Sequence, residues 1–150
     1  MAWGGVSFNA RTELVFIQNG TLNAHRYLTE VLEVHAVPFM MTLGENATFM
    51  HDNARPHTAR MVNDYLDEVQ ITRFVWPARS PDLNPIEHVW DEIKRRLRKH
   101  VPAPRNSREL REMVVQEWNY LPQHVIQNLI RSMPRRLQAV IAARGGNTRY

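Results

Sequence analysis

The chain has 150 residues, 43% of them hydrophobic, which is enough for one domain with a buried core. It contains no cysteine, and this excludes disulfide bonds, thiolate catalysis and metal sites with cysteine ligands. It also contains neither a run of about 18 apolar residues nor a basic-then-apolar leader, so we expect a soluble, intracellular protein with no membrane partner.

The formal net charge is only +4, but it is unevenly distributed. Residues 1–93 carry 6 lysines and arginines against 12 aspartates and glutamates, a net charge of −6. Residues 94–150 carry 13 against 3, a net charge of +10. A polyanion such as nucleic acid would bind the basic C-terminal part, where neutralised phosphates release counterions. Solvated helix faces would give the same charge pattern, and both interpretations stay open.

Strands and helices alternate along the first part of the chain. Short apolar or alternating segments predict strands at residues 3–8, 13–18, 48–51 and 71–76. The first two would form a hairpin around a turn at 9–11. Residues 23–35 predict a helix that Asn23 caps and Pro38 closes. A second helix follows Pro56, with an apolar stripe made of Met61, Val62, Tyr65 and Leu66.

Helices dominate the second part. After a turn-rich stretch at 77–85, a helix is predicted from Asn84 to about His100. Its apolar face is made of Ile86, Val89, Trp90, Ile93 and Leu97. Two more helices are predicted at 107–120 and 124–144, the second interrupted or kinked at Pro134. Strands that alternate with helices in this way indicate an α/β layered domain.

Asp52 is a candidate functional residue because of its position. It follows the predicted strand at 48–51, and polar residues at the carboxyl ends of strands are where sites of α/β domains usually lie. The alternative is a loop aspartate that caps the next helix or closes a turn with Asn53.

Glu87 has the same two interpretations. It is the third residue after Asn84, and Pro85 stands at the first helical position, as in a capping box. On a helical wheel it lies about 100° from the centre of the apolar face, on the side of Asp91, Lys94 and Arg98. A carboxylate at that edge can face a cleft, and the two basic side chains could hold a phosphate backbone.

Two motifs surround these carboxylates. Residues 51–59 read HDNARPHTA and residues 76–90 read WPARSPDLNPIEHVW. They closely resemble the second and third catalytic blocks of DDE transposases of the Tc/mariner superfamily, and the 34 residues between Asp52 and Glu87 match the usual spacing of that family. The resemblance extends to the family's central region at residues 3–5 and 20–24.

The resemblance implies an RNase H-like fold, in which a mixed α/β sheet is flanked by helices. It covers residues 1–100 well, which would form the RNase H-like core of a single partial catalytic domain spanning 1–150. Residues 101–150 would add basic C-terminal helices. The implied reaction is cut-and-paste DNA transposition: hydrolysis of a phosphodiester bond at the element's end, then strand transfer to target DNA.

The implied chemistry needs carboxylates because it uses two Mg²⁺ or Mn²⁺ ions, which prefer oxygen ligands. By the resemblance, Asp52 and Glu87 are the catalytic carboxylates and metal ligands. The implied partner is DNA, as transposon ends and target, in the nucleus of a eukaryote, and a homodimer is a further expectation. Four basic residues are predicted to contact DNA: Lys94, Arg95, Arg98 and Lys99.

The sequence departs from the family at the first of its three carboxylates, which should precede the hairpin. Asp52 is the first aspartate of the chain, and none of the earlier glutamates lies in a matching block: Glu13, Glu30, Glu33 and Glu45. We therefore expect the first central strand, the first metal ligand and the upstream helix-turn-helix region to be absent. We also expect negligible cleavage by this chain alone.

Two alternatives remain beside a transposase fragment. One is a non-enzymatic remnant that binds nucleic acid, or forms dimers, through its basic C-terminal helices. The other is a small RNase H-like nuclease with an acidic cluster of Asp52, Glu87 and Asp91.

The histidines and tryptophans are weaker candidates for a functional site than the carboxylates. His51, His57, His88 and His100 match none of the usual zinc-ligand spacings. His57 is predicted to lie near the site or to cap its helix, and Trp76 and Trp90 are predicted to pack in the core rather than to stack on bases.

Overall fold

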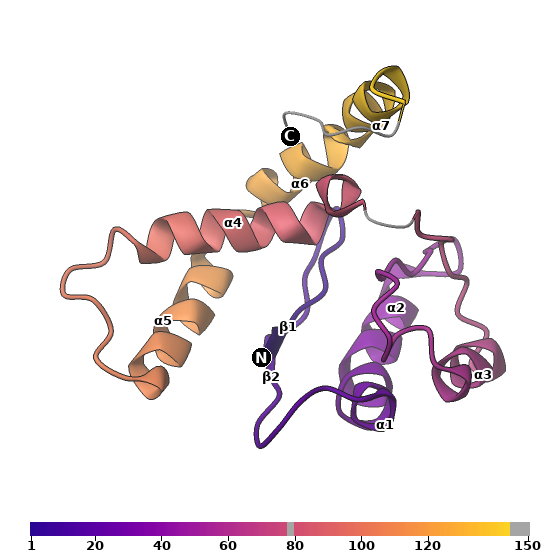
Figure 1. The fold of residues 1–150 in the computed structure, drawn as a ribbon, viewed down its shortest axis with the longest axis horizontal. Coiled ribbons are helices and arrows are strands. Elements are labelled where there is room, and N and C mark those ends of the chain that lie inside the picture. Colours follow the sequence, from indigo (N-terminus) through magenta and orange to yellow (C-terminus); the bar gives the residue numbers. More distant parts are fainter. Residues whose placement is uncertain (78–79, 145–150) are drawn as a thin grey trace. The chain divides into compact units, whose positions relative to one another are not determined.

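The computed structural model describes residues 1–77 and 80–144 (Figure 1). The contacts within the chain divide it into two units. Unit 1 contains Met1–Gly5 and Thr12–Arg79, and unit 2 contains Val6–Arg11 and Ser80–Tyr150. In the described part of the chain, no helix is long and apolar enough to cross a membrane.

The predicted hairpin is confirmed. Strands β1 (Ala2–Trp3) and β2 (Val15–Phe16) pair antiparallel, and a further bridge joins Val6 to Arg11. The regular strands are shorter than predicted. Between them and that bridge, Gly5 and Thr12 face each other: the Thr12 Oγ1 accepts the backbone N–H of Gly5 at 2.8 Å. The base of the hairpin belongs to unit 1, and its tip belongs to unit 2.

The first helical segment is longer than predicted. Asn23 caps it, since its side chain accepts the backbone N–H of Arg26 at 2.9 Å. It runs through α1 (Ala24–Arg26), the π-helical segment η1 (Tyr27–Ala36) and α2 (Val37–Leu43). The prediction that Pro38 closes this helix is wrong. A proline cannot donate a backbone hydrogen bond and crowds the carbonyl four residues before it, and the wider π-helical winding that precedes Pro38 relieves this conflict.

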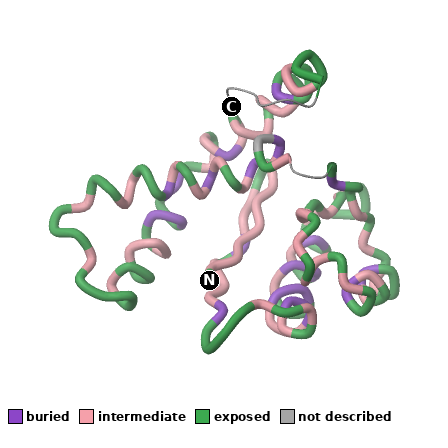
Figure 2. Tube along the Cα trace, in the orientation of Figure 1, coloured by how far each residue is buried: buried purple, intermediate pink, exposed green. Residues whose placement is uncertain are grey.

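The core of unit 1 forms between this helical segment and α3 (Arg60–Glu68), as Figure 2 shows in purple. Its fully buried side chains are Tyr27, Val31, Leu32, Val62 and Leu66, each 0% exposed. Burying one such aliphatic side chain contributes about 1.5–3 kcal/mol to stability. The predicted helix after Pro56 is thereby confirmed, although Met61 remains 41% exposed.

The strands predicted at 48–51 and 71–76 are reduced to one parallel bridge between Phe49 and Arg73. Phe49 donates its backbone N–H to the carbonyl of Thr72 at 2.7 Å and accepts the N–H of Phe74 at 2.8 Å. The expectation of a buried core strand is wrong, because Met50 is 41% exposed and Phe49 is only half-buried. A strand needs pairing along its length, and in the described part of the chain the pairing of these two segments is limited to that bridge.

Unit 2 is helical. The short 3-10 helix η2 (Pro81–Leu83) leads into α4 (Pro85–Leu97), which packs against α5 (Ser107–Tyr120) and α6 (Gln123–Arg131). Helix α7 (Met133–Ala142) follows, with Pro134 in its first turn, so the predicted interruption is confirmed. Its most deeply buried hydrophobic side chains are Val89, Ile93, Trp118, Leu121 and Ile126.

Of the four tryptophans of the chain, Trp76 and Trp90 are the two predicted to pack in the core. Trp76 is 8% exposed in unit 1. Trp90 is half-buried in unit 2 and stacks on Trp118, with 5.4 Å between the ring centroids.

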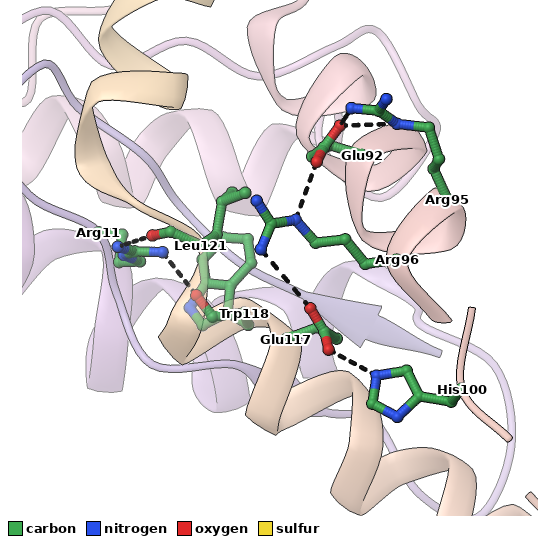
Figure 3. A network of polar contacts seen from close by, with 8 residues as sticks. All are labelled: Arg11, Glu92, Arg95, Arg96, His100, Glu117, Trp118 and Leu121. Atoms are coloured by element: carbon green, nitrogen blue, oxygen red, sulfur yellow. Dashed lines mark hydrogen bonds and ion pairs between the residues drawn. The ribbon is translucent and has the colours of Figure 1, made fainter. Parts of the chain in front are cut away.

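Polar contacts fasten the hairpin tip to the end of α5 within unit 2 (Figure 3). The Arg11 guanidinium donates to the carbonyls of Trp118 and Leu121, each at 2.5 Å. Gln123 donates its side-chain N–H to the carbonyls of Ser7 and Phe8 at 3.0 and 3.1 Å. A cation at the carboxyl end of a helix is favourable, because the last carbonyls there lack intrahelical partners.

A second network lies between α4 and α5 (Figure 3). Glu117 is 9% exposed, and its carboxylate lies 2.6 Å from His100 Nε2 and 3.8 Å from Arg96. Arg96 also contacts Glu92 at 2.8 Å. A buried carboxylate needs such partners, since an unpaired charge in this position would be costly.

Candidate active site

Asp52 lies in unit 1, just after the segment that pairs with Arg73. Its Oδ1 accepts the backbone N–H of Ala54 at 3.0 Å and lies 2.7 Å from Nδ1 of His57. The side chain is 48% exposed, and among the described residues Oδ2 makes no hydrogen bond. Asp52 does close a local turn, as the alternative held, but it does not cap α3, whose N-cap is Ala59. The turn uses one oxygen and leaves the other available.

Three aromatic rings, those of His57, Tyr27 and His51, pack together beside Asp52. The His57 ring packs on Tyr27, with 4.2 Å between centroids, and lies parallel to His51 at 5.2 Å with an interplanar angle of 7°. Of the two positions predicted for His57, beside the site or at the helix cap, the structure shows a contact with Asp52 and no side-chain cap on α3. The role of Tyr27 was not visible in the sequence, because it comes from a helix far upstream of the motif.

Burial changes the pKa values of two groups beside Asp52. Burial first, and the electrostatic influence of His57 second, lower the pKa of His51 to about 4, so its ring is neutral near pH 7. Burial and the nearby Asp52 carboxylate raise the pKa of Tyr27, so the phenol keeps its proton. The Tyr27 hydroxyl and Nδ1 of His51 lie 3.1 Å apart and share a hydrogen bond, whose donor is set by the His51 tautomer.

Arg73 is held by α3. Its guanidinium donates to the backbone and side-chain oxygens of Asn63, at 3.2 and 2.8 Å, and also pairs with Asp67. Asp52 thus has His57 as its one ionisable partner in the described part of the chain. An open groove of about 590 Å³ runs along this side of unit 1 and is lined in part by His51, His57, Asn63 and Arg73.

Glu87 lies in unit 2, in the first turn of α4. The Asn84 side chain accepts the N–H of Ile86 at 3.4 Å and so caps the helix. The backbone N–H of Asn84 donates to the carbonyl of Pro81 at 2.8 Å, so the donor that a capping-box glutamate would use is already taken. The capping-box interpretation is therefore wrong. Glu87 is exposed, and its side chain has no hydrogen bond or ion pair within the described ranges.

Asp52 and Glu87 belong to different units, so their pairing in one site remains a prediction. Across residues 1–77 and 80–144, no group of three or more histidine, aspartate or glutamate side chains is placed to hold a metal ion. His51 and His57 stack face to face rather than converging on a common point.

The four basic residues predicted to contact DNA fall into two pairs. Lys94 contacts Asp91 at 3.2 Å, and Arg95 pairs with Glu92. Arg98 and Lys99 are exposed and have no ion pair with any described residue. Burial would raise the pKa of Glu92, but hydrogen bonds from Arg95 and Arg96 outweigh it and lower that pKa.

Residues 4–111 match the family described as DDE superfamily endonuclease. The Tcb1 transposase of Caenorhabditis briggsae is 37% identical over 151 residues, which cover 100% of this chain and 54% of that protein. The Tc1 transposase of Caenorhabditis elegans is 34% identical over 151 residues, which again cover 100% of this chain and 54% of that protein. The chain spans about half the length of these relatives.

Solved structures show the same fold. A structure of the Mos1 transposase catalytic domain with raltegravir and Mg has a TM-score of 0.82 and 21% identity, covering 98% of this chain and 75% of that one. A Mos1 transposase paired-end complex with the left transposon end has a TM-score of 0.73 and 23% identity, covering 89% and 39%. The predicted RNase H-like fold is confirmed. The chain belongs to the DDE superfamily endonucleases, and it is similar to the catalytic part of Tc1/mariner-type transposases.

Proposed function

We propose that this chain is the part of a transposase that holds DNA and a divalent metal during cut-and-paste transposition, with Asp52 and Glu87 as metal ligands. The observation that carries this is the state of the two carboxylates: each lies in a segment that matches the family, each is accessible, and neither pairs with a described lysine or arginine. Carboxylates that serve only stability are usually paired or act as caps.

The donor set fits Mg²⁺ or Mn²⁺. These hard cations take oxygen ligands and bind through one or two carboxylates together with substrate phosphate. When bound, two such ions stabilise the attacking and leaving oxygens of a displacement at phosphorus. Asp52 offers Oδ2, while Oδ1 is held by Ala54 and His57. Glu87 stands at the amino end of α4, where the helix dipole favours a negative charge.

The metal assignment is tested by Mn²⁺ binding to the 150-residue chain, followed by electron paramagnetic resonance. Asp52→Asn and Glu87→Gln should each weaken binding, because each removes a charged ligand. Asp64→Asn is the matched control, since Asp64 is an exposed carboxylate that pairs with Arg60 at 3.4 Å. Equal Mn²⁺ affinity in the wild type, both variants and the control would refute the assignment. In either case we expect no strand cleavage by this chain alone.

The DNA surface is proposed to centre on Arg98 and Lys99, whose charges are not neutralised by described acids. Each phosphate contact adds about 0.9 to the slope of log affinity against log salt. Arg98→Gln with Lys99→Gln should therefore lower the slope by up to about 2. Lys94→Gln with Arg95→Gln removes the same charge from side chains that Asp91 and Glu92 hold, and should lower it less. Equal slopes for the two double variants would argue against this surface.

The relatives are nematode proteins, so we propose that the full-length protein acts in the nucleus on transposon ends and target DNA, as a homodimer that serves two ends. A DNA-binding remnant without metal chemistry is the second candidate, favoured by the +10 charge of residues 94–150. It predicts salt-dependent binding that Asp52→Asn leaves unchanged, together with no Mn²⁺ affinity. The small-nuclease alternative is weaker, because its third carboxylate, Asp91, contacts Lys94 at 3.2 Å.

A further inference from the structure

His57 is fixed on three sides. Its Nδ1 lies 2.7 Å from Oδ1 of Asp52 and 3.3 Å from the Asp52 carbonyl oxygen. One ring face contacts Tyr27, whose side chain is 0% exposed and belongs to the core of unit 1. The ring also lies parallel to His51. The imidazole side chain is only 15% exposed, against 48% for the carboxylate that it contacts.

These contacts define which nitrogen carries the proton. Both oxygens that face Nδ1 can only accept, one being a carboxylate oxygen and the other a carbonyl oxygen. Nδ1 must therefore be protonated and donate to Asp52. The Nδ1–H of His57 and the backbone N–H of Ala54 then both donate to the same oxygen, Oδ1 of Asp52.

We propose that His57 is a positioning residue for the metal ligand Asp52: seated on Tyr27, it binds Oδ1 and so presents Oδ2 to the cation. The proposal rests on the proposed function. The chain of contacts runs from the core through the Tyr27 ring and the imidazole to the carboxylate, and this transfers the rigidity of the core to an exposed side chain. Without the imidazole, only the Ala54 N–H would hold Asp52, and the carboxylate could sample other rotamers.

Other roles for His57 do not fit its contacts. A helix cap is ruled out, because α3 begins at Arg60 and has no side-chain cap. A zinc ligand would need neighbouring donors directed at a common point, but Nδ1 of His57 faces Asp52 and Nδ1 of His51 faces the Tyr27 hydroxyl. A role in packing alone would not need the 2.7 Å contact to Oδ1.

Two substitutions separate positioning from packing. His57→Phe keeps a ring on Tyr27 but removes the donor, whereas the amide of His57→Asn can replace the Nδ1 donor. Groups that orient a ligand typically change metal affinity by about 10- to 100-fold. We expect Mn²⁺ affinity to fall by about that factor in His57→Phe and to stay within a few-fold of wild type in His57→Asn. A folded His57→Phe chain with wild-type Mn²⁺ affinity would overturn the proposal, provided that Asp52→Asn weakens binding.

A measurement without metal separates this proposal from the metal assignment itself. The Hα–Hβ couplings of Asp52, measured by NMR, should report one rotamer in the wild type and in His57→Asn, and averaged rotamers in His57→Phe. The nitrogen shifts of His57 in the wild type should show the tautomer with the proton on Nδ1. Proton placement on Nε2 alone, or a single Asp52 rotamer in His57→Phe, would overturn the proposal whatever the metal does. If Asp52→Asn binds Mn²⁺ as tightly as the wild type while these NMR results hold, only the metal assignment is refuted.

Discussion

Arg11 is expected to contribute more to the stability of unit 2 than any other single side chain of the hairpin tip. It donates two hydrogen bonds, at 2.5 Å each, to the carbonyl of Trp118 in α5 and to that of the C-cap residue Leu121. Hydrogen bonds from charged donors contribute about 1.5–3 kcal/mol each. Since the Arg11 side chain is only partly buried, we expect Arg11→Met to lower the free energy of unfolding of unit 2 by about 2–4 kcal/mol in total.

Native-state hydrogen exchange measures this locally. Amides at the carboxyl end of α5, and that of the C-cap residue Leu121, should exchange faster in Arg11→Met by about 30- to 1,000-fold, the exchange equivalent of 2–4 kcal/mol. Arg11→Lys should recover part of the protection, because one ammonium group cannot span both carbonyls in the manner of a guanidinium. Arg98→Met is the control, since Arg98 is exposed and has no described ion pair. Equal protection of α5 in Arg11→Met and Arg98→Met would refute the reasoning.

Three further predictions concern helix ends and charge. Asn23→Ala should lower the free energy of unfolding of unit 1 by about 1 kcal/mol in urea denaturation, because it removes the cap of α1; no change would mean that this end is already frayed. Gly44→Ala should lower the free energy of unfolding by about 1 kcal/mol in the same assay, because Gly44 has φ of 88°, where a Cβ strains the backbone, and a new methyl group would find nothing within 4 Å to contact. A gain in stability would show that the backbone is not strained there. Glu92 has a lowered pKa, so its charged carboxylate stabilises the fold above the ordinary pKa of 4.5, and this stabilisation is lost as the pH falls further. In Glu92→Gln, the melting temperature should therefore fall less between about pH 5 and pH 3 than in the wild type. The same pH profile in both proteins would count against this prediction.

Helix ends were predictable because their signals are local. Asn23 and Asn84 cap helices where the sequence indicated, and the predicted bounds of the 107–120 helix match α5. Pro38 misled because tertiary packing overrode a local rule: Val37 and Met40, on either side of it, are buried at 5% and 7% exposed. The strands at 48–51 and 71–76 were overestimated for a related reason, since a strand depends on neighbours that its own residues do not specify.

In the candidate site, too, features with a local sequence signal were predicted, and features that depend on tertiary packing were missed. Asp52 and Glu87 were found through their motifs, and the structure removes the capping-box interpretation of Glu87 through the Asn84–Pro81 hydrogen bond. The contact between His57 and Asp52 was predicted only as proximity. The support from Tyr27 was missed, because it depends on packing between a helix and a loop that lie 30 residues apart in the sequence.

The hairpin also sets a constraint on how this chain can be divided and assembled. Its base and tip belong to different units, so no single cut in the sequence yields the two units as separate polypeptides. A fragment that starts at residue 80 would leave the carbonyls of Trp118 and Leu121 without their donor from Arg11. During synthesis, Arg11 must wait for acceptors that lie 107 and 110 residues later, and such distant closures slow folding. The unit that carries Glu87 therefore cannot be completed until most of the chain has been made.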